Sequence, residues 1–168
     1  MSDNYTQFSF ELNNLKKSEI KWLKKALALN LIDGEPDGPN NRQFYKTLDL
    51  SPTEYPYIEY WPDFDWRIEE ENKTLWIYSD DSGNIHNATV LAHAFLKKFR
   101  PKEVITIGVA FTCSKPRVDE FGGGLYIVNK DGVYDDNVGD LIAGVLRDGI
   151  QRTIRMRNLT IIVRKTKR

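Results

Sequence analysis

The order in which two apolar periodicities follow one another is the feature that most constrains the fold of this chain. Period-two alternation, typical of strands, and helical spacing mark six segments in turn: 7–12, 18–31, 63–69, 74–79, 84–99 and 103–113. The resulting order is strand, helix, strand, strand, helix, strand, which is the split βαβ arrangement of ferredoxin-like folds. We therefore predict an α+β fold, with one mostly antiparallel sheet and helices packed mainly on one face.

Beyond residue 124 the sequence adds a hairpin, a helix and a strand. Lys130-Asp131-Gly132 supplies an Asp-Gly turn between two short apolar runs. Helical spacing predicts a third helix over 138–150, and an apolar run predicts a closing strand over 159–163, ahead of a basic tail at 164–168. A chain of 168 residues is long enough to bury one core, so we predict one domain spanning residues 1–168.

Residues 33–62 interrupt the pattern as an irregular excursion over the surface. They hold five of the seven prolines, together with aromatic side chains that can anchor the segment. Tyr and Trp bury a large area at little cost in rotamer entropy, which makes them frequent interface anchors. Two interpretations stay open for this group: a partner interface, or the excursion's own small core. The residues concerned are Tyr55, Tyr57, Tyr60 and Trp61.

Charge is balanced over the whole chain but not along it. Twenty-four basic residues face twenty-four acidic ones, and this balance argues against a general nucleic-acid coat protein, which needs surplus cations. Residues 49–81 nevertheless carry ten acids against two cations, and residues 147–168 carry eight cations against one acid. Such polarity either steers partners or reflects ordinary solvated faces. The basic segment keeps nucleic-acid binding through residues 152–168 open as an alternative function.

Cysteine content and hydropathy indicate the compartment. The single cysteine, Cys113, cannot form an internal disulfide, and the first residues do not resemble a signal peptide. No apolar run approaches the roughly 20 residues that a membrane helix requires. We therefore expect a cytoplasmic protein without a membrane partner, in a bacterial cell or in the host cell of a phage.

The segment from Cys113 to Gly124 carries the densest chemistry in the chain. Lys115 and Arg117 flank a rigid proline, and three consecutive glycines can turn main-chain N–H groups toward an anion. The segment is not a P-loop, because no Gly-Lys-Ser/Thr follows and its glycines open a strand. One interpretation is a site for an anionic ligand or a partner's polar surface, and the other is a connection stapled by an internal ion pair. The predicted binding residues are Ser114, Lys115, Arg117, Glu120, Gly122, Gly123 and Gly124.

Residues that often serve catalysis or metal binding lack the necessary arrangement. Cys113 shares the apolar face of its strand, where a free cysteine behaves as a small buried hydrophobe. His86 and His93, expected at the surface or the edge of the core, are seven residues or about 10 Å apart along one helix, whereas metal-binding pairs stand at i and i+4. Asp80 and Asp81 are better placed to cap the helix that follows than to bind a cation. We therefore predict no catalytic residue, no metal site and no cofactor.

Two segments resemble a known family of small proteins: Trp76-Ile77-Tyr78-Ser79-Asp80-Asp81-Ser82-Gly83-Asn84, and Cys113 to Gly124. In that family, from bacterial genomes, plasmids and phages, an lwiYS-(D/E)-x-x-G strand and turn precede a helix. A CSKPR-x-x-EFGGG loop follows the next strand, and the likeness covers about residues 60–130. The resemblance implies that the chain belongs to a mobile genetic element or its host, and that the loop is the family's working part. It brings no catalytic assignment.

Together these features predict a non-enzymatic binding protein that engages a protein or a phosphate-bearing ligand through the 113–124 loop. Small size and the missing catalytic set suit a steric or sequestering role, such as countering a host defence system. One alternative is an enzyme acting on a nucleotide or phosphorylated substrate beside the same loop, with Cys113 or a histidine as the reacting group. It requires an imidazole within hydrogen-bonding reach of Cys113. Nucleic-acid binding is the other alternative.

Overall fold

The computed structural model of the protein describes residues 4–29, 39–55, 58, 60–114, 122–137, 154–156 and 159–161. These residues contain eight strands and three helices. In chain order the elements are β1 (Asn4–Leu12), α1 (Lys17–Leu27), α2 (Pro39–Leu48), β2 (Asp65–Glu69), β3 (Thr74–Ser79), α3 (Ile85–Phe99), β4 (Ile105–Cys113), β5 (Gly122–Asn129), β6 (Gly132–Asn137), β7 (Ile154–Met156) and β8 (Leu159–Ile161).

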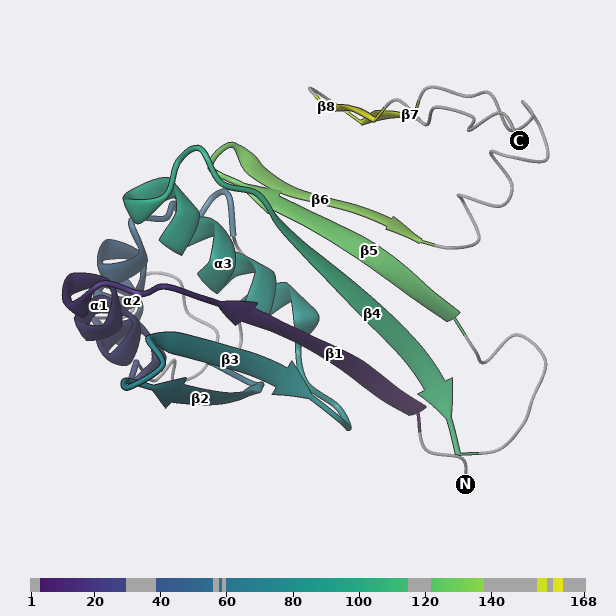
Figure 1. The fold of residues 1–168 in the computed structure, drawn as a ribbon, viewed down its shortest axis with the longest axis horizontal. Helices are drawn as coiled ribbons and strands as arrows, with labels where there is room; N and C mark the ends of the chain where they lie inside the picture. The colour runs from purple at the N-terminus through teal and green to yellow at the C-terminus, as the bar shows by residue number, and fades with distance from the viewer. Residues whose placement is uncertain are drawn as a thin grey trace.

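Six strands form one antiparallel sheet in the order β2-β3-β1-β4-β5-β6 (Figure 1). The first four strands have the order of a split βαβ fold, with β3 and β1 between β2 and β4, and with helical crossovers before β2 and β4. Strands β5 and β6 extend the sheet beyond β4 as a hairpin. The predicted α+β class, with its ferredoxin-like start, is confirmed.

The hydrophobic core lies between the sheet and the helices. Phe8, Phe10 and Leu12 of β1 are buried. Ser9 and Glu11, which alternate with them, are exposed on the opposite face. Successive side chains of a strand point to opposite faces, so this alternation gives the sheet one apolar face and one open face.

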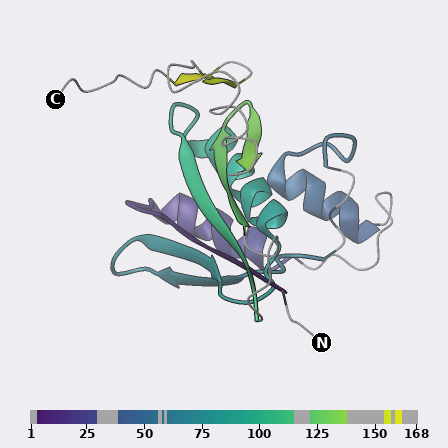
Figure 2. The ribbon, with the colours of Figure 1, turned by 90° about the vertical axis from the view of Figure 1, so that its right-hand side faces the viewer.

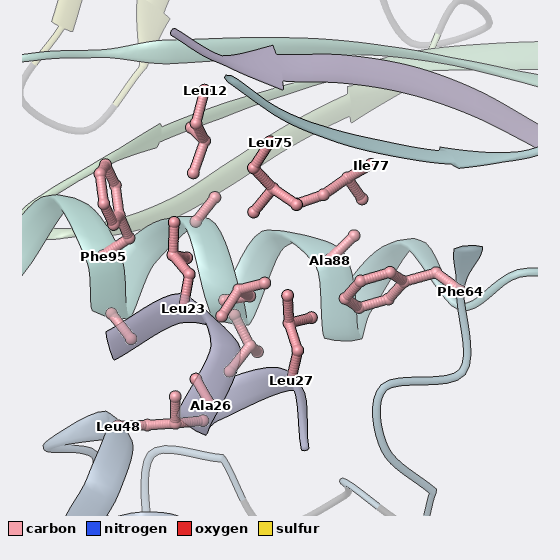
Figure 3. Packing of buried hydrophobic residues seen from close by; sticks show 14 of the residues in the cluster. Leu12, Leu23, Ala26, Leu27, Leu48, Phe64, Leu75, Ile77, Ala88 and Phe95 are labelled. Carbon is pink, nitrogen blue, oxygen red and sulfur yellow. The ribbon is translucent and has the colours of Figure 1, made fainter. Parts of the chain in front are cut away.

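Helices α1 and α3 supply the other half of the core. Figure 3 shows Leu75 and Ile77 of β3 reaching toward α3, and Leu23 and Leu27 of α1 joining the same cluster. Figure 2 shows α2 on the side of α3 that is remote from β4. Within the described ranges, no helix is long and apolar enough to cross a membrane.

The excursion between residues 33 and 62 contains a helix, so the prediction of an entirely irregular segment is wrong. α2 begins at Pro39 and buries Phe44, Tyr45 and Leu48 in the core cluster. Proline is tolerated in the first turn of a helix, where its missing N–H has no intrahelical partner to lose. The next proline, Pro52, comes after the helix has ended. The prolines thus flank α2 and do not interrupt it.

Several predicted boundaries differ from those observed. α1 ends at Leu27, four residues before its predicted end. α3 is capped by Asn84, whose Oδ1 accepts a hydrogen bond from Asn87 N at 3.2 Å, so the assignment of the cap to Asp80 and Asp81 is wrong. The predicted strand at 159–163 appears as β8, which pairs with β7 in a separate two-stranded sheet. The predicted helix at 138–150 and the tail at 164–168 lie outside the described residues.

The sheet divides between β1 and β4. Their register runs from Asn4↔Cys113 to Phe8↔Val109 and stops there. Beyond this point β1 continues to Leu12 in register with β3, and the first residues of β4 are in register with β5. Figure 1 shows β1 and β4 diverging toward the end at which β1 finishes, with α3 passing behind the gap. The pairing of β1 with β4 spans five residue pairs, as many as the pairing of β1 with β3, and the two strands separate beyond it.

Candidate functional site

The 113–124 loop leaves the sheet at the end of β4 and returns at the start of β5. Cys113 is the last residue of β4, and the exposed Ser114 follows it. Phe111 and Gly122 are partners in the β4–β5 register, so the two ends of the loop are held side by side. Three of the predicted binding residues lie outside the described part of the chain: Lys115, Arg117 and Glu120.

The three glycines of the loop motif belong to strand β5. Gly122, Gly123 and Gly124 are all in register with β4. A Cβ atom at Gly123 would stand 2.7 Å from the main-chain oxygen of Val109, which is closer than real side chains approach. Close packing of two strands therefore accounts for the glycine at 123. The role of the three glycines in binding an anion stays a prediction.

Gly123→Ala is expected to lower the free energy of unfolding by about 1–3 kcal/mol, because the added methyl group meets a backbone oxygen of β4. Gly108→Ala is the matched control: a Cβ atom there meets nothing within 4 Å, so we expect a change within about 0.5 kcal/mol. Urea unfolding followed by circular dichroism compares the two variants. Equal destabilisation of the two variants would show that the loss of stability in Gly123→Ala does not come from a steric conflict with Val109.

The first residues of β1 lie between this loop and the turn that precedes α3. On one side, Asn4 is in register with Cys113. On the other side, Thr6 donates its N–H to the main-chain oxygen of Asp81 at 2.6 Å. The two segments that carry the family resemblance are far apart in the sequence. The fold brings them to the two sides of one strand, at the same end of the sheet.

Ser79 holds the turn in place. Its Oγ donates to Thr6 O at 3.1 Å and accepts from Gly83 N at 2.8 Å. The main-chain oxygens of Asp80 and Asp81 accept hydrogen bonds from β1, while both residues are exposed. Exposed carboxylates thus stand across β1 from the loop. Exposed polar groups of this kind can form hydrogen bonds and ion pairs with a polar partner.

Cys113 is buried, with 9% of its surface exposed, as its place in the strand pattern predicts. His93 cannot serve as a base for it. His93 Nδ1 lies 2.8 Å from the main-chain oxygen of Asn129, at the end of β5 that pairs with the start of β4. The strand from Ile105 to Cys113 separates the two sites by about 26 Å at 3.3 Å per residue.

Both histidines contact Tyr55 of the excursion. The ring centroid of Tyr55 lies 6.3 Å from that of His86 and 5.9 Å from that of His93. His93 is only 5% exposed, more buried than its predicted place at the edge of the core, because Tyr55 packs against it. His86 is exposed, and the partial burial of its ring lowers its pKa, whereas burial together with the charge of Glu54 raises the pKa of Tyr55 to about 12. Tyr55 therefore acts as a neutral ring that fastens the excursion to α3.

The four aromatic residues predicted as a possible interface do not form one surface. Trp61 is 6% exposed, and its Nε1 donates to the main-chain oxygen of Ala26 at 2.9 Å, so it belongs to the core. Tyr60 beside it is 65% exposed, and Tyr55 is half-buried. Tyr57 lies outside the described residues. An interface role for Tyr60 stays a prediction.

The open face of the sheet carries an aromatic pair that the sequence analysis does not single out. Trp76 and Tyr78 of β3 stack with ring centroids 4.0 Å apart, and Trp76 is 37% exposed. Trp76 Nε1 donates to Ser9 Oγ of β1 at 2.8 Å. The pair could have been found in the sequence from the alternation of β3, because Trp76 and Tyr78 alternate with the buried Leu75 and Ile77 and so lie on the other face of the sheet.

The described residues hold no group of three or more His, Cys, Asp or Glu side chains that could bind a metal ion. The candidate functional site is therefore the end of the sheet where the loop between β4 and β5 and the turn before α3 lie on the two sides of β1. Comparisons with protein-family models, with curated proteins and with solved structures found no match.

Proposed function

We propose that this protein is a non-enzymatic binding protein of a bacterial or mobile-element background, acting in the cytoplasm. Its partner is another protein or a phosphate-bearing ligand, held by the loop between β4 and β5. Inhibition of a host defence system by steric blocking or sequestration suits its size and the family resemblance. The proposed contact residues are Ser114, Lys115, Arg117, Glu120, Gly122, Gly123 and Gly124.

The observation that supports this proposal is that both ends of the loop are fixed by strand pairing. Its two ends are in register at Phe111 and Gly122, and β1 braces the neighbouring turn through Ser79. A segment with fixed ends has less freedom to lose on binding, so more of its interaction energy appears as affinity. Exposed Ser114 on one side of β1 and the exposed carboxylates on the other supply polar groups for recognition.

The enzymatic alternative has less support. It needs a base beside Cys113, and His93 is fixed at the opposite end of β5. His86 packs against Tyr55 of the excursion. Nucleic-acid binding through residues 152–168 is supported by the charge of that segment alone.

Charge reversal in the loop tests the proposal. Lys115→Glu/Arg117→Glu is expected to weaken binding about tenfold or more, because two charge-assisted contacts become repulsive. Calorimetry with inorganic phosphate and with ATP probes the phosphate-bearing class. Affinity purification from a bacterial lysate, quantified by mass spectrometry, probes the protein class.

The control is Lys102→Glu/Lys130→Glu, which changes the net charge equally. Both lysines are exposed, and they flank the other end of β4 and β5. The site assignment fails when the loop variant keeps every interaction that the control variant keeps.

A further inference from the structure

The cleft between β1 and β4 has a volume of about 710 Å³ and opens at the opposite end of the sheet from the 113–124 loop. Its walls are the two diverging strands, with polar and charged side chains around the opening. The residues that line it include Ser9, Glu11, Asn13, Arg100, Glu103 and Thr106.

Hydrogen bonds at the closed end of the cleft show which main-chain groups of β1 face it. Thr6 directs both of its groups toward β3, because its N–H donates to Asp81 O and its oxygen accepts from Ser79 Oγ. The direction of main-chain groups alternates from residue to residue along an antiparallel strand. Ser9 and Glu11 therefore direct their N–H and C=O groups toward β4.

The same alternation applies to β4. Gln7 has the orientation of Ser9, and its partner in the register is Ala110. It follows that Gly108 and Thr106 direct their main-chain groups toward β1. The register ends at Phe8↔Val109, a pair whose own main-chain groups point away from each other and which is therefore bounded by the facing groups of Ser9 and Gly108. Beyond it, Glu11 and Thr106 have no partner in the β1–β4 register within the part of the chain that the structure describes.

The side chains beside these free edges are small. Ser9 and Thr106 stand on the two walls, and a Cβ atom at Gly108 would meet nothing within 4 Å. Another main chain can therefore approach both walls without a steric conflict at these positions.

We propose that the cleft binds an extended polypeptide segment of another protein, which pairs with β1 and β4 as an inserted strand. Two facing strand edges recognise a peptide main chain, because an extended chain carries donors and acceptors along both of its sides. Neither a phosphate backbone nor a sugar supplies this repeat. The free edges, residues 10–12 and 105–107, are each about 10 Å long at 3.3 Å per residue, which fits a paired segment of about three residues. This surface is separate from the 113–124 loop, so the inference does not depend on the proposed function.

Proline substitution tests the proposal, because proline removes a main-chain donor. The N–H of Thr106 faces the cleft, so Thr106→Pro removes that donor without removing a donor to β5. Thr106→Ala is the matched control, since it trims the side chain and keeps the N–H. The probe is a phage-displayed library of short random peptides, selected on the complete wild-type chain.

We expect the selected peptides to bind Thr106→Ala within about threefold of the wild type and to bind Thr106→Pro about tenfold or more weakly. With peptide bound, hydrogen exchange of residues 10–12 and 105–107 should slow, while exchange in β2 stays unchanged. If Thr106→Pro does not fold, as judged by circular dichroism, Glu11→Pro and Glu11→Ala give the same comparison from β1.

Recovery of no peptide overturns the proposal, as does equal binding to the proline variant with unchanged exchange in both segments. A wild-type dimer that the peptide dissociates would assign the cleft to a second copy of this chain and overturn the foreign partner.

Discussion

Replacing Arg100 by methionine is expected to lower the free energy of unfolding by about 3–5 kcal/mol. Arg100 Nε and Nη2 donate to the two carboxylate oxygens of Glu19 at 3.2 and 3.1 Å, and Nη2 also donates to Asn14 O at 3.2 Å. The side chain of Glu19 is only 3% exposed. Loss of the guanidinium therefore leaves a buried carboxylate without its countercharge. Urea unfolding measures the cost.

Glu19→Gln/Arg100→Met is the control for this prediction. The neutral amide removes the buried charge, and its side-chain oxygen can keep the hydrogen bond that Lys16 N donates to Glu19 Oε2 at 2.7 Å. We expect the double variant to recover at least half of the lost stability. A loss below about 1 kcal/mol in Arg100→Met would place this pair among ordinary surface ion pairs.

The stability of the wild type and that of Arg100→Met should depend on pH in opposite directions, because Glu19 has its countercharge only in the wild type. In the wild type, burial acts to raise the pKa of Glu19, but the hydrogen bonds from Arg100 and Lys16 N outweigh it and the pKa is lowered. A lowered folded pKa gives stability above the unfolded value of about 4.3, which is lost as the pH falls through the folded pKa. In Arg100→Met burial prevails, the pKa of Glu19 rises, and stability should increase as the pH falls from about 7 to 5.

Trp61→Ala is expected to cost about 3–5 kcal/mol of stability. The indole makes edge-to-face contacts with Phe44 of α2 and with Phe64, at centroid distances of 4.9 and 6.0 Å. It also donates to Ala26 O of α1. One side chain thus joins the end of the excursion to α2, the helix within the excursion, and to α1 of the core. Thermal unfolding followed by circular dichroism, with chemical unfolding for the free energy, provides the measurement.

Tyr60→Ala is the neighbouring control, because Tyr60 is 65% exposed and its truncation should change stability by less than about 0.5 kcal/mol. Trp61→Phe keeps a ring in the cluster and loses the hydrogen bond to Ala26, so its cost should lie between the two. A similar small cost for Trp61→Ala and Tyr60→Ala would mean that the excursion is not anchored through Trp61.

The element order could be predicted because each element carries its own local periodicity. Phe8, Phe10 and Leu12 alternate with polar residues whatever strand they pair with, and the helical stripe of α3 is equally self-contained. α2 also has a local signal in the spacing of Phe44 and Leu48. Its first-turn proline, Pro39, is compatible with a helix, and reading it as a helix start would have found the element.

Features that depend on distant partners could not be predicted in this way. Arg100 and Glu19 are 81 residues apart, and neither stands in a pattern that points to the other. Residues 105–113 form one continuous strand, but β1 pairs with only part of it. The burial of Cys113 was predictable from strand alternation. The steric need for glycine at 123 was not, because it arises from the approach of Val109 across the sheet.

The place of β1 in the sheet has a consequence for biosynthesis. Phe8 is in register with Ser79 on one side and with Val109 on the other. The first strand to leave the ribosome therefore has no neighbour until the third has been translated, and it lacks its second neighbour until the fourth has been translated. In contrast, β2 and β3 can pair as soon as they emerge. Throughout that interval the nascent chain carries an apolar, unpaired segment near its N-terminus, the kind of segment that chaperones shield from aggregation.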